Sequence, residues 1–328
     1  MTLARAIASA RAQDLRTQAD QEAPTRRRLL PNIEAIVERL HFHRAAVDAV
    51  FFAKRAIVSP TSSAIAGEAD LAGYPLGFCG QIRDQVLDRL LADAAFRELI
   101  GTEVVLKKIF VLLKGVYFQN ALQLGNLYVD VANDTVFIDK PKIEWLRIED
   151  VRFENAESWR AVAAVGRRYY EVELYPNLLF PLAFPSAPYF AIRSSGRIDL
   201  FQAQNVIFLK DLGDDLRRAR ALLDDPEFWR RPLPEVYRRL IERACGGNLH
   251  AAFPLEYAPT DAEGLRTRVL PEFAALARQG DATALTTIQN YTRLMQDAAT
   301  RLARMNLRPS DEELAQLRKD GAVPAATE

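Results

Sequence analysis

The spacing of apolar residues changes at Thr102 and again at Asp211, and these changes limit the folds open to the chain. Before Thr102 the apolar residues recur at helical spacing, as in the stretches 29–56 and 81–100. Between the two positions the chain is rich in β-branched and aromatic residues, and after Asp211 the helical spacing returns. The pattern predicts an α+β protein with a helical N-terminal segment, a central antiparallel sheet and a helical C-terminal region.

Strands are expected in the middle region wherever β-branched and aromatic residues gather or alternate with polar ones. These segments are 104–118, 122–132, 135–148, 169–174, 189–193 and 198–209. Asn133-Asp134 and the run 194–196 are typical of turns between antiparallel strands. Later helices are expected at 212–223, 234–245 and 262–306. The charged tail beyond Pro309 should be frayed.

The same pattern predicts how the 328 residues divide into regions. We expect a helical N-terminal segment over 1–58, an α+β core over 59–210 and a helical region over 211–328. The core should hold its sheet against the helix that follows Cys79.

The composition indicates which kinds of partner the protein binds and in which compartment it lies. The formal net charge is zero at pH 7, so no nucleic-acid partner is expected. The 2 cysteines predict free thiols in a reducing compartment. No apolar run is long enough for a membrane span, and the basic stretch 1–11 lacks the apolar core of a secretory signal. We therefore expect a bacterial protein of the cytoplasm.

Cys79 is the first candidate for chemistry. It follows a turn broken by glycine and proline at 73–78 and stands at the first turn of a predicted helix. Free N–H groups and the helix dipole stabilise a thiolate there, as nucleophilic cysteine chemistry requires. The alternative is that Cys79 only fills a junction between helix and sheet, because free cysteines are often buried.

Three short motifs occur in an order that is typical of one superfamily. They are Gly77-Phe78-Cys79, Asn126-Leu127-Tyr128-Val129-Asp130-Val131 and Ile138-Asp139-Lys140-Pro141. Together they resemble the transglutaminase-like branch of the papain-like cysteine enzymes. The resemblance implies that Cys79 is the nucleophile of an acyl transfer or of an amide or ester hydrolysis. It also implies that Asp139 is the orienting acid and that Asn126 occupies the position of the basic histidine. The simpler alternative is that Asp139 is a turn or cap residue before Pro141 and that Asn126 is a turn residue.

The asparagine departs from the pattern of the superfamily, because an amide has no usable basicity near neutral pH. The domain is then a pseudoenzyme, or another histidine enters the site, or a thiolate stabilised by the helix and Arg83 does other chemistry. Among the 3 histidines, His250 is expected in a loop and is the best candidate for a base, with a solvated loop residue as the alternative. His41 and His43 lie on a predicted helix and are expected to be structural or surface residues.

Substrate binding is assigned to side chains close to the motifs, namely Tyr74, Gln81, Arg83 and Tyr128. The expected partner is a peptide or a protein. No cofactor is expected, and no metal site is expected because the chain has so few histidines and cysteines.

Two further functions remain open. One is a non-catalytic binding or scaffold protein, with the proline- and aromatic-rich segment 175–190 either as a wall of its cleft or as a buried connection. The other is a glycosyltransferase-like enzyme that holds a metal and a sugar nucleotide through Asp130 and Asp134. Acidic residues at a hairpin turn are the simpler interpretation of that pair.

Overall fold

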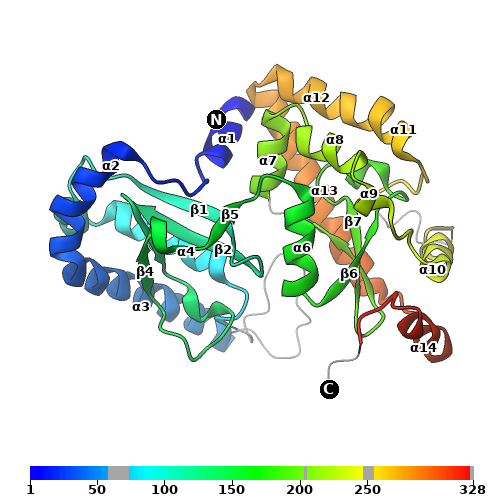
Figure 1. Cartoon of the computed structure of the whole chain (residues 1–328), viewed down its shortest axis with the longest axis horizontal. Helices are drawn as coiled ribbons and strands as arrows, with labels where there is room; N and C mark the ends of the chain where they lie inside the picture. The colour runs from blue at the N-terminus through cyan, green and yellow to red at the C-terminus, as the bar shows by residue number, and fades with distance from the viewer. Residues whose placement is uncertain (58–73, 203–204, 247–254, 326–328) are drawn as a thin grey trace. The chain divides into compact units, whose positions relative to one another are not determined.

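A computed structural model describes residues 1–57, 74–202, 205–246 and 255–325 (Figure 1). It contains many helices and two antiparallel sheets, which confirms the predicted α+β class. The chain divides into two compact units. Residues 12–114 and 118–155 form the first, here called the cysteine unit. Residues 1–11, 115–117 and 156–328 form the second, the C-terminal unit.

These boundaries differ from the predicted ones at 58 and 210. Residues 12–57 pack with the sheet that follows them, because their apolar side chains share one core with those of strands at 122–131. The segment 156–210 belongs instead with the later helices, because its own sheet shares a core with them. Apolar periodicity identifies elements, but not which elements share a core.

The cysteine unit is built on a five-stranded sheet in the order β4-β3-β2-β1-β5. Its strands are β1 (Leu106–Leu113), β2 (Tyr117–Leu124), β3 (Leu127–Asp130), β4 (Glu144–Arg147) and β5 (Phe153–Asn155). Its helices are α2 (Ala19–Pro24), α3 (Ile33–Ile57), α4 (Cys79–Ala92) and α5 (Ala94–Ile100). Helix α4 packs against the sheet, and α3 packs against α4 (Figure 1).

The register of β2 and β3 determines which side chains face α4. Leu122 pairs with Val129, and both join the core formed with α4. Residues one position along each strand point to the opposite face, where Ala121 and Tyr128 pack against Leu15. This alternation places Asn120 on the α4 face and Asp130 on the other.

The C-terminal unit contains a three-stranded sheet of β6 (Val172–Pro176), β7 (Tyr189–Arg193) and β8 (Ile198–Phe201). Its helices are α1 (Leu3–Arg11), α6 (Trp159–Tyr169), α7 (Asn205–Gly213), α8 (Arg217–Leu223), α9 (Pro226–Trp229), α10 (Glu235–Gly246), α11 (Ala262–Gly264), α12 (Leu270–Gln279), α13 (Ala282–Met305) and α14 (Asp311–Lys319). Helices α6 and α13 cover opposite faces of this sheet (Figure 1).

Several predicted strands are wrong over part of their length. Turns at 114–116 and 125–126 interrupt the predicted strands 104–118 and 122–132, and the start of 169–174 belongs to the end of α6. In 135–148 only β4 is a strand, because Asn133 begins a 3-10 turn and Pro141 has no N–H to donate to a sheet. In 198–209 the strand ends at Phe201 and α7 begins at Asn205. The apolar run in α7 is buried on all sides, so its sequence has no periodicity that separates helix from strand.

The tail is also more ordered than predicted. Helix α14 begins with a capping box in which Ser310 and Glu313 satisfy each other's backbone N–H groups. Its Leu314 is buried in the core of the C-terminal unit. The capping box and the contact of Leu314 stabilise this helix, although the composition of the segment is typical of a frayed end.

The proline- and aromatic-rich segment 175–190 is a buried connection between β6 and β7. Phe180 and Phe184 are fully buried, and Asn177 Nδ2 donates to the Ala187 carbonyl at 3.0 Å. This internal hydrogen bond gives a partner to a backbone carbonyl group that is buried away from water.

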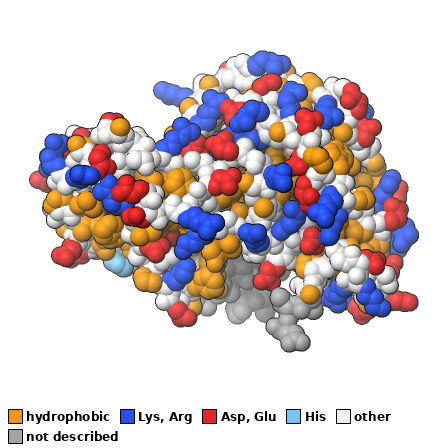
Figure 2. Space-filling model, viewed as in Figure 1, with side chains coloured by type: hydrophobic (Ala, Val, Ile, Leu, Met, Phe, Trp, Pro, Cys, Tyr) orange, Lys and Arg blue, Asp and Glu red, His pale blue; other side chains and the backbone are white. Residues whose placement is uncertain are grey.

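The surface carries charges of both signs, as the zero net charge predicts. Lys and Arg side chains lie interspersed with Asp and Glu over the face shown in Figure 2. Within the described ranges, none of the helices combines the length and the apolar character of a membrane span.

Substitution of Gly166 tests how closely α6 packs on the three-stranded sheet. A Cβ at this position would lie 2.4 Å from Cζ of the Phe201 ring, so Gly166→Ala should destabilise the protein by about 1–3 kcal/mol through overpacking. The measurement is urea unfolding. Gly80→Ala is the matched control in another helix, because its Cβ would meet Asn120 Nδ2 at 3.7 Å, an ordinary contact. Equal stability of the two variants would contradict this packing.

Candidate functional site

Helix α4 begins at Cys79, as the sequence predicts. The turn before it contains Gly77 with φ +79°, a conformation that glycine adopts without strain. The Gly77 N–H donates to the Thr135 carbonyl at 3.0 Å, which ties this turn to the segment after β3. The glycine therefore lets the chain enter α4 with the thiol in its first turn.

The side chain that contacts the sulfur is Asn120 of β2. Its Nδ2 donates to Cys79 Sγ at 3.3 Å, and its Oδ1 accepts from Arg83 at 2.7 Å. The same Arg83 nitrogen donates to the Ile109 carbonyl at 3.0 Å. Because a guanidinium has only donors, it turns the amide oxygen toward itself and the amide nitrogen toward the thiol.

Burial raises the pKa of the Cys79 thiol above its ordinary value. The Asn120 amide and the Gly80 N–H act in the opposite direction, because each stabilises a thiolate, while the charge of Asp130 adds to the rise. The net shift is upward. The sulfur is therefore held mainly as a thiol at neutral pH.

A buried ionic network, here called the Arg44 network, holds the turn in front of Cys79. Arg44 of α3 donates to both oxygens of Asp134, at 2.8 and 3.0 Å, and to Asp48 at 2.8 Å. Asp48 also accepts from the Tyr74 hydroxyl and, at 2.6 Å, from Lys142. These contacts join α3, the turn before α4 and the segment after β3.

The network fixes the charges of its members. Burial acts to raise the pKa of Asp48, but hydrogen bonds from Lys142, Tyr74 and Arg44 outweigh it and lower the pKa. Burial and the bond to Asp48 together raise the pKa of Tyr74. Asp48 is thus an anion and Tyr74 a neutral donor over the physiological range.

Asp130 lies on the face of the sheet away from α4. Its Oδ1 accepts from the Ala132 N–H at 2.8 Å and its Oδ2 from Gln119 Nε2 at 2.7 Å. Burial raises the pKa of Asp130 to about 7, and Glu144 and Asp134 add to the rise. This carboxyl group has no direct ion pair among the described residues, in contrast to Asp134.

The structure does not bring the other two predicted triad members to Cys79. Asn126 accepts from the Gln18 N–H at 2.9 Å and donates to the Gln18 carbonyl at 3.0 Å, so it anchors the N-terminal segment. Asp139 is exposed in a turn instead of lying on a strand. The strand predicted there does not form, so nothing directs its carboxylate toward α4.

The histidines provide no base in the described part of the chain. His250 lies outside the described residues. His43 is buried and contacts Asp93 at 2.8 Å, while His41 is exposed on α3. The interpretation of these two as structural and surface residues agrees with their positions.

The four predicted binding residues have different surroundings. Gln81 is exposed on the first turn of α4, next to Cys79. Arg83 orients Asn120, and Tyr74 belongs to the Arg44 network. Tyr128 is buried on the opposite face of the sheet, 3.5 Å from Asp130. Only Gln81 is placed to meet a ligand directly.

Sequence reasoning missed Asn120 and Arg44. Asn120 follows Gln119 inside an apolar strand, and Arg44 stands in the middle of a half-buried helix. Polar residues in apolar elements must find partners when they are buried. That rule could have marked both residues as members of a site.

The pair Asp130 and Asp134 does not converge on one ligand position. Asp134 is bound by Arg44, whereas Asp130 bonds Gln119 on the other face of the sheet. Across the described residues, no group of three or more His, Cys, Asp or Glu side chains is arranged to hold a metal ion.

Comparisons of the chain with known protein families, with curated proteins and with solved structures found no match.

Removing Arg44 tests the role of its network. Arg44→Met should lower the free energy of unfolding by about 3–5 kcal/mol, because it leaves buried Asp134 without its ion-pair partner and removes one of the two cations that pair with Asp48. It should also speed alkylation of Cys79, because the turn before α4 loses its anchor. Urea unfolding and peptide mass spectrometry measure the two effects. Arg26→Ala is the control: this guanidinium is 72% exposed, and its loss should cost less than about 1 kcal/mol.

Asp130 should make stability depend on pH. Its folded pKa of about 7 exceeds the unfolded value, so the folded state binds the extra proton. This contribution, up to about 4 kcal/mol from about 1.4 kcal/mol per pKa unit, is complete below pH 4 and lost as the pH rises through 7.

Asp130→Asn should therefore be more stable than the wild type at pH 8 and should flatten the pH profile of urea unfolding. Asp134→Asn should behave in the opposite way and destabilise the protein at pH 8, because it weakens a buried ion pair. Wild-type stability that does not fall between pH 4 and 8 would rule out this account of Asp130.

Proposed function

We propose that the cysteine unit is a transglutaminase-like thiol domain that binds a peptide or protein partner at Cys79 and has lost acyl transfer. The observation that carries this proposal is the contact of Asn120 Nδ2 with Cys79 Sγ at 3.3 Å. A nucleophilic thiol needs a proton acceptor at this distance, and an amide nitrogen is a donor only. Burial, which raises the pKa of the thiol, supports the same conclusion.

In this proposal the partner binds at the first turn of α4. The first N–H groups of a helix have no partner within it, and Phe78 at the N-cap makes no side-chain hydrogen bond to α4 in the described structure. A peptide carbonyl oxygen beside Cys79 would accept from these groups, as an oxyanion does in an acyl transferase. Exposed Gln81 adds an amide that can pair with a peptide backbone.

An active acyltransferase or amide or ester hydrolase is the second candidate. It is supported by the start of α4 at Cys79 and by the bond from Gly77 to Thr135, which hold the thiol in the first turn of the helix. In that case the base comes from outside the described residues, with His250 as the first residue to test.

The bacterial cytoplasm is the location we propose. The support is that Cys79 and Cys245 are both free, as in a reducing compartment.

The first experiment is the pH dependence of iodoacetamide alkylation, followed for each cysteine by peptide mass spectrometry. Cys79 should react slowly at pH 7 and faster as the pH rises past the ordinary thiol pKa of about 8.5. Cys245 is the internal comparison, since burial also raises its pKa. Fast reaction of Cys79 at neutral pH would favour the active enzyme instead.

The second experiment restores a base. In Asn120→His an imidazole stands where the amide contacted the sulfur, so alkylation of Cys79 at pH 7 should rise at least about tenfold. A burst of p-nitrophenol from p-nitrophenyl acetate should accompany it and vanish in the Asn120→His, Cys79→Ala double variant. Asn120→Gln, which keeps an amide, is the matched control and should show neither effect.

If Asn120→His leaves Cys79 as slow as in the wild type while the protein stays folded, the site lacks the geometry of a thiol enzyme. Cys79 is then a packing residue, and the transglutaminase-like proposal fails.

A further inference from the structure

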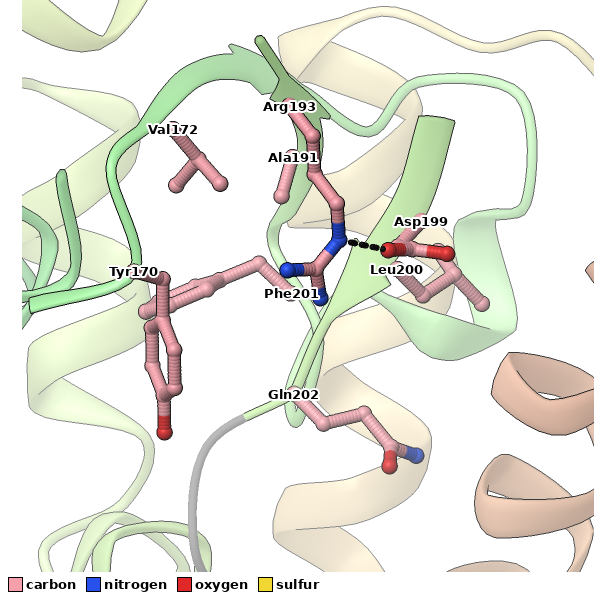
Figure 3. Close-up of a pocket in the computed structure, with 8 residues that line it drawn as sticks. All are labelled: Tyr170, Val172, Ala191, Arg193, Asp199, Leu200, Phe201 and Gln202. Atoms are coloured by element: carbon pink, nitrogen blue, oxygen red, sulfur yellow. Dashed lines mark hydrogen bonds and ion pairs between the residues drawn. The ribbon is translucent and has the colours of Figure 1, made fainter. Parts of the chain in front are cut away.

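The C-terminal unit contains a pocket of about 210 Å³ on the α6 face of its three-stranded sheet. Its walls include Tyr170, Val172, Arg193, Asp199 and Phe201, with Gln202 at the end of β8 (Figure 3). Drug-sized ligands occupy pockets of roughly 300–1,000 Å³. This pocket therefore suits a smaller molecule, of about one ring and one polar group.

Aromatic rings form one side of the pocket. Phe201 lies against Gly166, where a Cβ would be 2.4 Å from the ring, so the missing side chain makes room for it. Tyr170 meets Phe201 edge to face, with ring centroids 6.2 Å apart. The two rings provide a wall on which a planar group can pack.

Arg193 supplies the polar side. Its Nε donates to Asp199 Oδ2 at 2.7 Å, which fixes the plane of the guanidinium. The two terminal nitrogens have no hydrogen-bond partner among the residues that the structure describes. In Figure 3 they point away from Asp199 into the space beside Phe201 and Gln202. The Arg193 side chain is 45% exposed, so a ligand can reach it from solvent.

The charge of this group favours an anion. Arg197 also contacts Asp199 Oδ2, at 3.3 Å, so two guanidinium groups share one carboxylate. One positive charge within these three side chains is left without a counterion. A guanidinium whose terminal nitrogens are free binds a carboxylate or phosphate through two parallel hydrogen bonds.

We propose that this pocket binds a small molecule in which a carboxylate or phosphate is attached to a planar ring. The anionic group pairs with the terminal nitrogens of Arg193, and the ring packs against Phe201 and Tyr170. Asp199 acts as a positioning residue that holds the guanidinium in place. The pocket lies within the C-terminal unit, so this proposal does not depend on the function proposed for Cys79.

The test is a ligand-observed NMR titration of the full chain with benzoate, phenyl phosphate and benzylamine. Both anions should bind, whereas benzylamine should not, because its ammonium group meets Arg193. The tighter of the two anions assigns the ligand as a carboxylate or a phosphate. Arg193→Gln should weaken anion binding about ten- to hundred-fold, the usual loss for charge-assisted hydrogen bonds.

Arg197→Gln is the matched control. It removes the other guanidinium on the same carboxylate oxygen but no wall of the pocket, so affinity should change less than about threefold. Phe201→Leu keeps an apolar contact with α6 and should weaken both anions by removing the ring. This variant also tests the site if Arg193→Gln does not fold.

Three results would overturn the proposal. They are an absence of saturable binding for both anions, binding of benzylamine as tight as that of benzoate, and equal losses in Arg193→Gln and Arg197→Gln.

Discussion

The buried guanidinium of Arg44 is the interaction on which the cysteine unit depends. Taking this charge out of water costs several kcal/mol in general, and only complete pairing offsets such a cost. Arg44 achieves it by binding Asp134, Asp48 and the Val131 carbonyl. These partners come from α3 and from the chain after β3, so the charge is satisfied only when distant segments meet. Tyr74 and Lys142 extend the same network to the turn before Cys79.

A second buried arginine decides the chemistry at the sulfur. Arg83 binds the oxygen of Asn120, so the nitrogen of that amide faces the thiol. The result is a cysteine that is positioned by a helix start but faced by a donor instead of an acceptor. Proximity and orientation are only part of nucleophilic catalysis, because the proton of the thiol must also have somewhere to go. The thiol therefore has the position of a nucleophile but lacks a group that accepts its proton, and the proposed loss of acyl transfer rests on this lack.

The parts of the fold predicted correctly are those with a local cause. The start of α4 at Cys79 follows from the glycine and proline before it, and β7 follows from a short run of aromatic and β-branched residues. Some errors have a local cause that the strand and tail predictions overlooked, such as Pro141 and the capping box of Ser310 and Glu313. Others occur where a distant contact outweighs a local preference. The Cys79 site shows the same limit: the motif at Asn126 has the expected order, but this asparagine bonds Gln18 at 2.9 Å, a residue 108 positions earlier.

The sequence by itself determined the α+β class, the helix that carries Cys79 and the scarcity of histidines in the chain. These three properties depend on the composition and on the spacing of residues a few positions apart, and neither changes with the conformation of the chain. The tertiary structure decided that Asn120 instead of Asn126 contacts the sulfur, that Asp130 and Asp134 serve different faces of one sheet, and that Arg193 faces a pocket. Each of these depends on strand register, and a shift of one residue moves a side chain to the opposite face. Register is set by packing across the whole sheet, so no short motif contains it.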